Sequence, residues 1–346
     1  MSLEEIIQSE PTYRRDQIYL AWFDEKINDF SHITTLSKSL REKLNSEPWF
    51  TVKEKILQKS EDDGTRKALL ELHDGQTIET VLMPRKSKKQ DQPDTVRYTV
   101  CISSQVGCPM KCAFCATGKL GLKRNLTYRE IVDQVRYWQK ILWDEKRGQI
   151  DNVVLMGQGE PLLNYDNVKL ALHIFIKYAQ IGPRKITIST VGVPEAMEKM
   201  VTEKDFPPVR FALSLHSAIP EKRAAIIPSH RVDFFNFLID WSKKYHTIFS
   251  SRTHFIGLEY IMLKDINDDD KHLNALIKLV SKLGLVRINL IPYNHGGCGD
   301  LFSGTEMEKI QTWQQKLNDH NIICTIRRSQ GLDIAAACGQ LANKQK

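Results

Sequence analysis

The chain has 346 residues, of which 41% are hydrophobic and 26% charged, and this ordinary globular composition excludes the disordered and collagen-like classes. Lysine and arginine outnumber aspartate and glutamate by 49 to 42, and the resulting net charge of +7 suits a polyanionic partner without requiring one. No run of about 18 apolar residues occurs and the acidic start MSLEEIIQSEP is unlike a signal peptide, so we expect a cytosolic protein without a membrane partner.

The first part of the chain contains two kinds of pattern. Over residues 11–44, apolar residues recur at spacings of three and four, which predicts a small helical domain within 1–48. Over 51–83, alternating apolar and polar residues are separated by the turn signals DDG and DGQ, which predicts a β-hairpin extension. We assign 49–96 to this extension and a basic linker. The basic run over 85–94 is either a solvated loop or a loop that contacts phosphate.

Residues 97–346 carry a repeating pattern of short strands and longer helices. Strand-like runs such as VRYTVCIS, DNVVLMG and KITIST alternate with amphipathic runs such as TYREIVDQVRYWQKIL, an order that predicts a parallel α/β fold. About six such units follow from this reading, which is too few for an eight-fold barrel and fits a partial (β/α)6 barrel. Active residues are then expected at the carboxyl ends of the strands.

A cluster of cysteines follows the first strand of this region. Cys108, Cys112 and Cys115 have the spacing C-x3-C-x2-C within one short loop. Three thiolates can hold three irons of a [4Fe–4S] cluster and leave the fourth iron open to a chelating substrate. A structural zinc site requires four protein ligands, and no second cysteine or histidine pair in the sequence supplies an obvious fourth ligand. The spacing therefore favours an iron–sulfur cluster over zinc.

The cysteine spacing resembles the signature of the radical S-adenosylmethionine (SAM) superfamily, and VVLMGQGEP resembles its glycine-rich stretch after the second strand. Longer segments resemble, in order and over nearly the whole chain, one branch of that superfamily. These segments are VCISSQVGCPMKCAFCATG, MGQGEPLLN, ITIST, SLHS, NLIPYN and DIAAACGQL, and they are similar to those of the RlmN/Cfr family of RNA adenosine methyltransferases. The ACGQL segment is peculiar to this branch. The resemblance implies a radical SAM barrel and an amino-terminal domain that helps to grip RNA.

The resemblance also implies a reaction. Cys338 would accept a methyl group from one SAM molecule, and a deoxyadenosyl radical made from a second would take hydrogen from that methyl, which then joins an adenine carbon. Cys101 would attack Cys338 in a transient disulfide and release the product. Glu79 matches the family's proposed proton acceptor. Without the resemblance, a lone glutamate in an alternating strand is expected to face solvent.

Seven further residues match the family's contacts to SAM. Each lies at the end of a predicted strand, and they are Gly159, Glu160, Ser189, Ser214, Leu215, His216 and Asn294. Taken singly, Ser189 and His216 would be ordinary residues at strand ends, and only their joint placement favours ligand binding. Cys298 and Cys324 match no family role and are expected to pack as small apolar side chains.

Two positions depart from the family, since Gln158 stands where methionine is usual and Ala335 where an acidic residue is usual. The resemblance favours carbon 2 of adenosine over carbon 8, with 23S ribosomal RNA as the substrate and transfer RNA as a second candidate. It implies an external electron donor such as flavodoxin or ferredoxin, and no DNA partner. Basic residues over 119–124 are candidate phosphate contacts. The alternatives are another radical SAM enzyme of the activase or thiolation type, which Cys101 and Cys338 argue against, and a non-catalytic RNA-binding protein.

Overall fold

The computed structural model describes residues 3–86, 95–251, 254–295 and 302–343, and a single large sheet runs through it. Its ten strands have the order β1-β2-β3-β4-β7-β8-β9-β10-β11-β12. From β4 onward all neighbours are parallel. These parallel strands are β4 (Val96–Cys101), β7 (Ile150–Leu155), β8 (Ile186–Thr190), β9 (Arg210–Ser214), β10 (Ile256–Met262), β11 (Val286–Pro292) and β12 (Ile323–Ile326).

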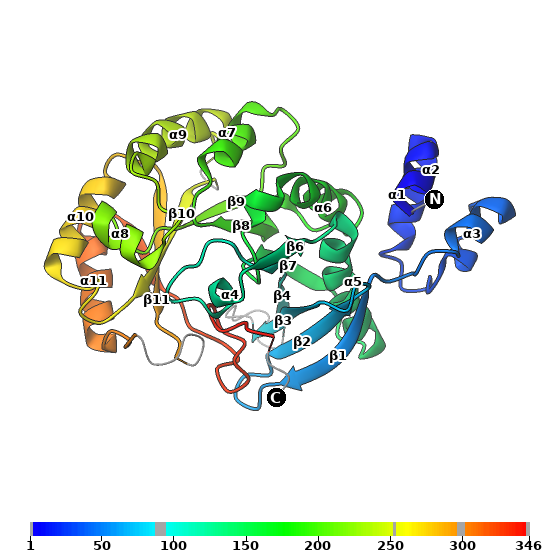
Figure 1. Cartoon of the computed structure of the whole chain (residues 1–346), viewed down its shortest axis with the longest axis horizontal. Coiled ribbons are helices and arrows are strands. Elements are labelled where there is room, and N and C mark those ends of the chain that lie inside the picture. The colour runs from blue at the N-terminus through cyan, green and yellow to red at the C-terminus, as the bar shows by residue number, and fades with distance from the viewer. Residues whose placement is uncertain (1–2, 87–94, 252–253, 296–301, 344–346) are drawn as a thin grey trace.

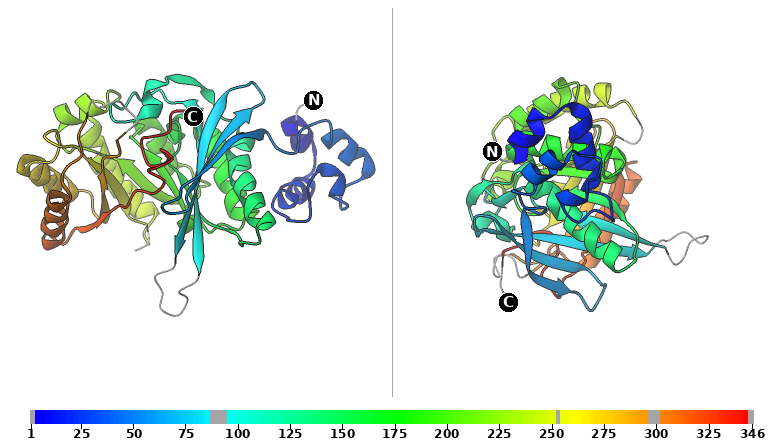
Figure 2. Two further views of the ribbon diagram at one scale, coloured as in Figure 1. Left: turned by 90° about the horizontal axis from the view of Figure 1, so that it is seen from below. Right: turned by 90° about the vertical axis from the view of Figure 1, so that its right-hand side faces the viewer.

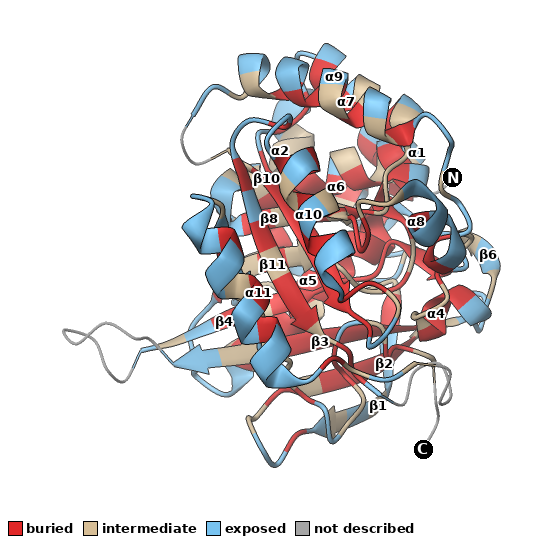
Figure 3. Ribbon diagram, turned by 90° about the vertical axis from the view of Figure 1, so that its left-hand side faces the viewer, coloured by how far each residue is buried: buried red, intermediate tan, exposed pale blue. Residues whose placement is uncertain are grey.

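Helices connect the parallel strands and cover the outer face of the sheet (Figure 1). The strands are buried, whereas the helices turn their exposed side to solvent (Figure 3). All seven residues of β10 are buried, as is typical of a parallel strand covered on both faces. The alternation confirms the expected partial (β/α)6 barrel. Its larger helices are α5 (Tyr128–Asp144), α6 (Tyr165–Lys177), α7 (Pro194–Thr202), α9 (Phe234–Ile248), α10 (Asp270–Val280) and α11 (Met307–Asp319).

The predicted hairpin extension continues the barrel sheet. Strands β1 (Val52–Lys59), β2 (Arg66–Leu72) and β3 (Thr77–Lys86) are antiparallel, and β3 pairs with β4. A second, two-stranded sheet of β5 (Gln105–Gly107) and β6 (Leu122–Asn125) flanks the cysteine loop. The remaining short elements in this part of the fold are α4 (Ala116–Lys119), α8 (Pro220–Ile226) and the 3-10 turns Pro161–Asn164 and Pro183–Lys185.

The amino-terminal helices form a module at one end of the molecule, opposite α10 and α11 (Figure 2). They are α1 (Leu3–Ser9), α2 (Thr12–Ala21) and α3 (Lys38–Leu44), with a 3-10 turn at Phe30–His32. The hydroxyl of Ser37 accepts a hydrogen bond from the Leu40 amide at 3.3 Å and caps α3. Helix α1 precedes the range 11–44 in which the helical period was recognised, so it was not predicted as a separate helix.

A buried arginine joins this module to the barrel. The guanidinium of Arg136 in α5 lies over the rings of Trp22, Trp49 and Phe50, with centroid distances of 5.0, 4.7 and 4.4 Å. It also pairs with Asp133 and donates to the Trp49 carbonyl at 2.9 Å. A buried charge is tolerated only where it is paired and hydrogen-bonded. Here the module supplies the ring and the carbonyl of Trp22, and the segment that follows it supplies Trp49 and Phe50.

Replacing Arg136 by methionine is expected to lower the free energy of unfolding by about 3 kcal/mol, because Asp133 then remains buried without its counter-charge. Urea unfolding of the variant and the wild type measures this change in the free energy of unfolding. The matched control is Lys140→Met on the exposed face of the same helix, where loss of the pair with Asp144 should change stability by less than about 0.5 kcal/mol. Equal unfolding midpoints for the two variants would contradict the assignment.

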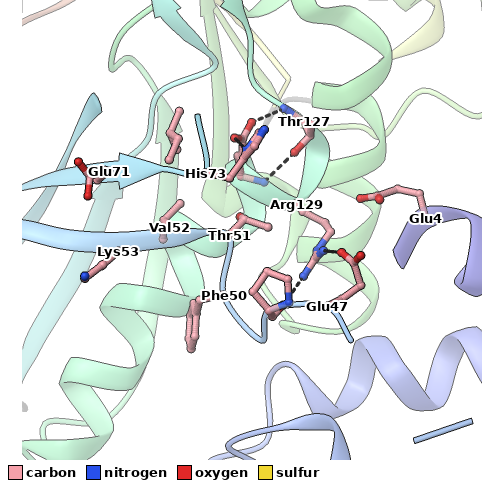
Figure 4. Close-up of a pocket in the computed structure, with 13 residues that line it drawn as sticks. Glu4, Glu47, Phe50, Thr51, Val52, Lys53, Glu71, His73, Thr127 and Arg129 are labelled. Carbon is pink, nitrogen blue, oxygen red and sulfur yellow. Dashed lines mark hydrogen bonds and ion pairs between the residues drawn. The ribbon is translucent and has the colours of Figure 1, made fainter. Parts of the chain in front are cut away.

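A cavity of about 540 Å³ lies where the helical module meets β1, β2 and the start of α5 (Figure 4). Arg129 spans it, donating to the Pro48 carbonyl at 2.8 Å and pairing with Glu47 at 3.7 Å. None of the predicted site residues lines this cavity. It therefore belongs to the junction of the module. Within the described ranges, no helix combines the length and apolar character needed to cross a bilayer.

Candidate active site

The three-cysteine loop lies over the carboxyl end of the barrel strands. Cys108 follows β5, and Cys115 immediately precedes α4. Between them, the ring of Phe114 packs edge-on against the ring of His216 at 4.6 Å, which ties the loop to the end of β9. The amide of Cys115 donates to the carbonyl of Cys112 at 3.1 Å and tightens the loop.

The three thiols fit a cluster that supplies positive charge. Burial raises the pKa of Cys108 to about 12 and the pKa of Cys112 well above its usual value, and the thiols of Cys108 and Cys115 raise the latter further. Such thiols stay protonated near neutral pH unless a cation stabilises the thiolates, which is what coordinated iron does. Among the residues described, no three side chains are already gathered closely enough to form a single metal-ion site.

The glycines after β7 are required by close packing. A Cβ on Gly157 would lie 2.6 Å from the carbonyl oxygen of Ile102, and a Cβ on Gly159 would lie 2.6 Å from Cβ of Gln105. Gly159 also has φ +102°, which side chains disfavour. The turn therefore packs directly against the segment after β4, which precedes the cysteine loop. This fixes the position of the next residue, Glu160.

Glu160 is a buried carboxyl group beside the cysteines. It is 2% exposed, its Oε1 accepts from the amide of Leu162 at 3.0 Å and its Oε2 from the amide of Val191 at 2.9 Å. Burial raises its pKa to about 7, and its charge in turn acts on Cys108 and Cys112. A buried carboxylate next to the cluster ligands is suited to hold an ammonium group.

This raised pKa predicts a pH dependence of stability. The folded protein holds the Glu160 proton with a pKa of about 7 and the unfolded chain with its ordinary value of 4.5, so stability is lost as pH rises through this window. The free energy of unfolding lost across this window is about 3 kcal/mol. Urea unfolding of the cluster-free protein at pH 5 and pH 8 should show a steeper loss for the wild type than for Glu160→Gln. Parallel losses would contradict the prediction.

The other predicted SAM contacts lie at strand ends on the same side of the barrel. Ser189 is in β8, and Ser214 ends β9. The amides of Leu215 and His216 donate to the carbonyl of Glu259 at 3.0 and 3.2 Å. His216 is 4% exposed and its Nδ1 accepts from the amide of Ile261 at 3.0 Å.

The imidazole of His216 is therefore neutral. Burial lowers its pKa to about 3, and the nearby charge of Arg223 lowers it further. Because Nδ1 is an acceptor, the ring proton is on Nε2. The backbone of His216 has φ +56°, in the left-handed region. A neutral ring in a constrained turn can donate one hydrogen bond to a ligand at the barrel mouth.

The carboxyl-terminal segment brings Cys338 to the same place. It passes beside α4 (Figure 1), where the Ala116 amide donates to the Gly339 carbonyl at 2.8 Å and the Thr117 hydroxyl to the Leu341 carbonyl at 2.8 Å. The Asn294 side chain donates to the Cys338 carbonyl at 3.2 Å. A predicted SAM contact and the predicted methyl carrier are thus directly joined.

Cys338 lies within electrostatic reach of two other cysteines. Burial raises the pKa of Cys101 at the end of β4 to about 12, and the charge of Cys338 raises it further. The charge of Cys338 also raises the pKa of Cys115. Cys338 is exposed, whereas Cys101 is buried, and all six described cysteines are free thiols. The segment that carries Cys338 therefore packs against Cys101 through Ala336 and Leu341 and is hydrogen-bonded to the end of the cysteine loop through Gly339 and Ala116.

Glu79 also belongs to this group and does not face solvent. It is 1% exposed, pairs with Lys67 at 3.2 Å and accepts from the amide of Asn343 at 3.0 Å. The alternating pattern of its strand did not predict this, because the strand lies inside the ten-stranded sheet and its polar face is covered by the carboxyl-terminal segment.

Comparisons with known proteins agree with this geometry. The model of the radical SAM superfamily matches residues 102–277. A dual-specificity RNA methyltransferase RlmN from a Nitratiruptor species is 38% identical, covering 96% of this chain and 94% of its own. A probable enzyme of the same name from Thermotoga maritima is 40% identical, covering 96% and 92%. A radical SAM methyltransferase from Sphaerobacter thermophilus has a crystal structure with a TM-score of 0.85 and 33% identity over 99% of this chain and 98% of that one.

The chain belongs to the RlmN family. It is a radical SAM methyltransferase, and it uses one [4Fe–4S] cluster and SAM. The cluster ligands of this RlmN-family enzyme are expected to be Cys108, Cys112 and Cys115, in agreement with the thiol environment described above. Glu160 lies close enough to two of these thiols for its charge to raise their pKa values.

Sequence reasoning missed one charged residue of the RlmN-type site. Arg327 follows β12 and pairs with Glu259 at 3.4 Å, and its Nη1 lies 3.4 Å from the sulfur of Met156. The charges of Cys338 and Glu259 raise the pKa of its guanidinium. In the sequence it is one of two arginines after a short strand, and nothing in that pattern marks it as part of the site.

The predicted phosphate contacts of this RlmN relative are only partly available. Arg124 is not free for phosphate, because Asp74 binds it at 2.6 Å and Glu130 at 2.8 Å. Lys123 remains exposed. The linker residues 87–94 and Cys298 lie outside the described residues, whereas Cys324 is buried as expected.

Proposed function

We propose that this enzyme methylates carbon 2 of an adenosine in RNA through a methyl group carried on Cys338. The relatives named RNA methyltransferases support RNA as the substrate, with 23S ribosomal RNA as the first candidate and transfer RNA as the second. The observation that carries the proposal is the course of the segment around Cys338. Its neighbour Gly339 accepts a hydrogen bond from the amide of Ala116, directly after Cys115, and Ala336 and Leu341 pack with Cys101.

A carrier thiol is needed because carbon 2 of adenine is a poor nucleophile. Carbon 2 of adenine lies between two ring nitrogens and is electron-poor, so it does not displace a methyl group from a sulfonium. Cys338 is exposed and can accept a methyl group from one SAM molecule by ordinary displacement. Cys108, Cys112 and Cys115 would hold the cluster, which would supply the single electron for cleavage of a second SAM molecule to the radical that activates the carried methyl group.

Residues at the strand ends would orient SAM. Glu160 is placed to accept hydrogen bonds from the ammonium group of the methionine part, since its carboxylate is buried next to the cluster cysteines. Gly159 permits the close approach of the chain there. The further contacts proposed from the family pattern are Ser189, Ser214, Leu215, His216 and Asn294.

Release of the product would use Cys101 and Glu79. Addition of the methylene radical to carbon 2 leaves one unpaired electron on the adduct, which the cluster would take back. Glu79 then takes the proton from carbon 2, and the electron pair of that bond restores the aromatic ring. The Cys101 thiolate attacks the Cys338 sulfur, so that a disulfide forms and the bond between that sulfur and the methylene carbon breaks. The electron pair of the broken bond passes to the methylene carbon, which takes up a proton and becomes the methyl group of the base. An external electron donor such as flavodoxin or ferredoxin would reduce the cluster, and a thiol reductant would reduce the disulfide by exchange. A reducing cytosol suits this cycle, and no DNA is required.

Mapping modified adenosines in ribosomal and transfer RNA from cells with and without this gene tests the proposal. We expect 2-methyladenosine to disappear from the affected position in the deleted strain and to return with the wild-type gene. An unchanged pattern in both RNA classes would overturn the assignment. An intact cluster with no methyl group on Cys338, measured by mass spectrometry of the purified enzyme, would instead favour another kind of radical SAM enzyme.

A further inference from the structure

The side chain of Asn343 occupies a small polar site beside Glu79. Its Nδ2 donates to the carbonyl of Thr77 at 2.7 Å, and its Oδ1 accepts from Nε2 of Gln158 at 2.7 Å. Its backbone amide donates to Oε2 of Glu79 at 3.0 Å. The site therefore offers one acceptor and one donor side by side, next to the carboxylate that would take the proton.

Gln158 is held rigidly in this site. It is 1% exposed, and its Oε1 accepts from the backbone amide of Glu79 at 3.3 Å. Its backbone is fixed as well, since its amide donates to the hydroxyl of Ser103 at 2.9 Å and its carbonyl accepts from the amide of Ser104 at 2.8 Å. With Oε1 already engaged, the Nε2 group is fixed as the donor that points to Asn343.

The edge of adenine has the same pattern as an asparagine side chain. A carboxamide presents a donor NH2 and an acceptor oxygen bonded to one carbon, and adenine presents its N6 amino group and N1 bonded to carbon 6. We propose that the Thr77 carbonyl and the Gln158 amide read N6 and N1 of the target adenine, and that Asn343 holds this place until RNA binds. This inference rests on the proposed function and names how that function selects its base.

The contact also selects the carbon. Carbon 2 is bonded to N1, so a hydrogen bond from Gln158 to N1 brings carbon 2 to the side of the site where Glu79 lies. Guanine and inosine carry an oxygen at position 6 and a hydrogen on N1. They would set acceptor against acceptor at Thr77 and donor against donor at Gln158, which leaves buried polar groups unpaired. The departure of Gln158 from the usual methionine thus supplies a hydrogen bond that methionine cannot.

Asn343 is suited to a place-holding role. Its φ of +53° lies in the left-handed region, which asparagine tolerates better than most residues. It is only half-buried, whereas Gln158 is fully buried, so the segment can leave while the reading pair stays. Its three contacts are hydrogen bonds that water or a base can replace.

The test compares RNA hexamers that are uridine-rich and carry one central base, bound to the reconstituted enzyme and followed by fluorescence anisotropy. The central base is adenosine, 1-deazaadenosine or 7-deazaadenosine. For the wild type, loss of N1 should weaken binding about tenfold and loss of N7 should not. In Gln158→Met the penalty for 1-deazaadenosine should vanish. A full penalty in Gln158→Met, or a penalty for 7-deazaadenosine instead, would overturn the reading of N1 by Gln158.

The place-holding role is tested separately with Asn343→Gly, which removes the side chain and relieves the left-handed backbone. Adenosine RNA should bind about threefold to tenfold tighter to this variant than to the wild type. Equal or weaker binding would show that Asn343 does not compete with the base. Methylation is scored in the same samples, so discrimination at N1 without methyl transfer would reject the proposed function alone, and methyl transfer without discrimination would reject this inference alone.

Discussion

Alanine at Cys112 is expected to abolish methyl transfer, with a fall in rate of at least about a thousandfold. Cys112 is the middle thiol of the loop, and the charges of both Cys108 and Cys115 act on it. Without it, only two protein ligands remain for a cluster that needs three. The anaerobically reconstituted variant should lack the visible absorption of a four-iron centre and should not cleave SAM under reduction.

The matched control is Cys324→Ala, which removes another buried cysteine in β12, away from the loop. It should keep both the absorption and the methyl transfer. Iron content close to four per chain in Cys112→Ala, or product formation at the wild-type rate, would show that the reaction does not depend on the three-cysteine loop.

The second large effect is expected from alanine at Cys338, which should also stop product formation while leaving the cluster intact. Cys338 is not a predicted ligand, and its segment is held by backbone contacts with Ala116 and by Thr117 that do not use the thiol. The loss should therefore be confined to the carrier step, because no sulfur remains to accept the methyl group.

Two measurements separate this variant from Cys112→Ala. Visible absorption and iron content should match those of the wild type, and mass spectrometry should find a methylated peptide around residue 338 only in the wild type. The Cys101→Ala variant supplies a further contrast, since it keeps the carrier and should accumulate RNA joined to Cys338. Full activity of Cys338→Ala would exclude a cysteine-borne methyl group.

The barrel was predictable because its sequence signals are local. The buried parallel strand β10 is apolar except for Glu259, and α5 begins with a capping box in which Thr127 and Glu130 bind each other's backbone. The cysteine loop and the GQGEP turn are contiguous in sequence and needed no knowledge of the fold. The resemblance of these segments to family motifs then allowed the site residues to be predicted.

What the sequence could not show depends on distant segments meeting. The burial of Glu79 is caused by Lys67 and by Asn343, which is 264 residues away along the chain. Arg124 looked like a free cation in its loop, but Asp74 and Glu130 neutralise it. Such pairings leave no periodic signal, because each partner alone has the pattern of a surface residue.

Contacts of helix α5 connect the amino-terminal module with the three-cysteine loop. Helix α5 holds the amino-terminal module through that arginine, and at its first turn Glu130 binds Arg124 of β6. Strand β6 pairs with β5, from which the chain runs directly into Cys108. The module is therefore connected to the three-cysteine loop through one helix and one small ribbon, so a displacement of the module would be felt at the start of that loop.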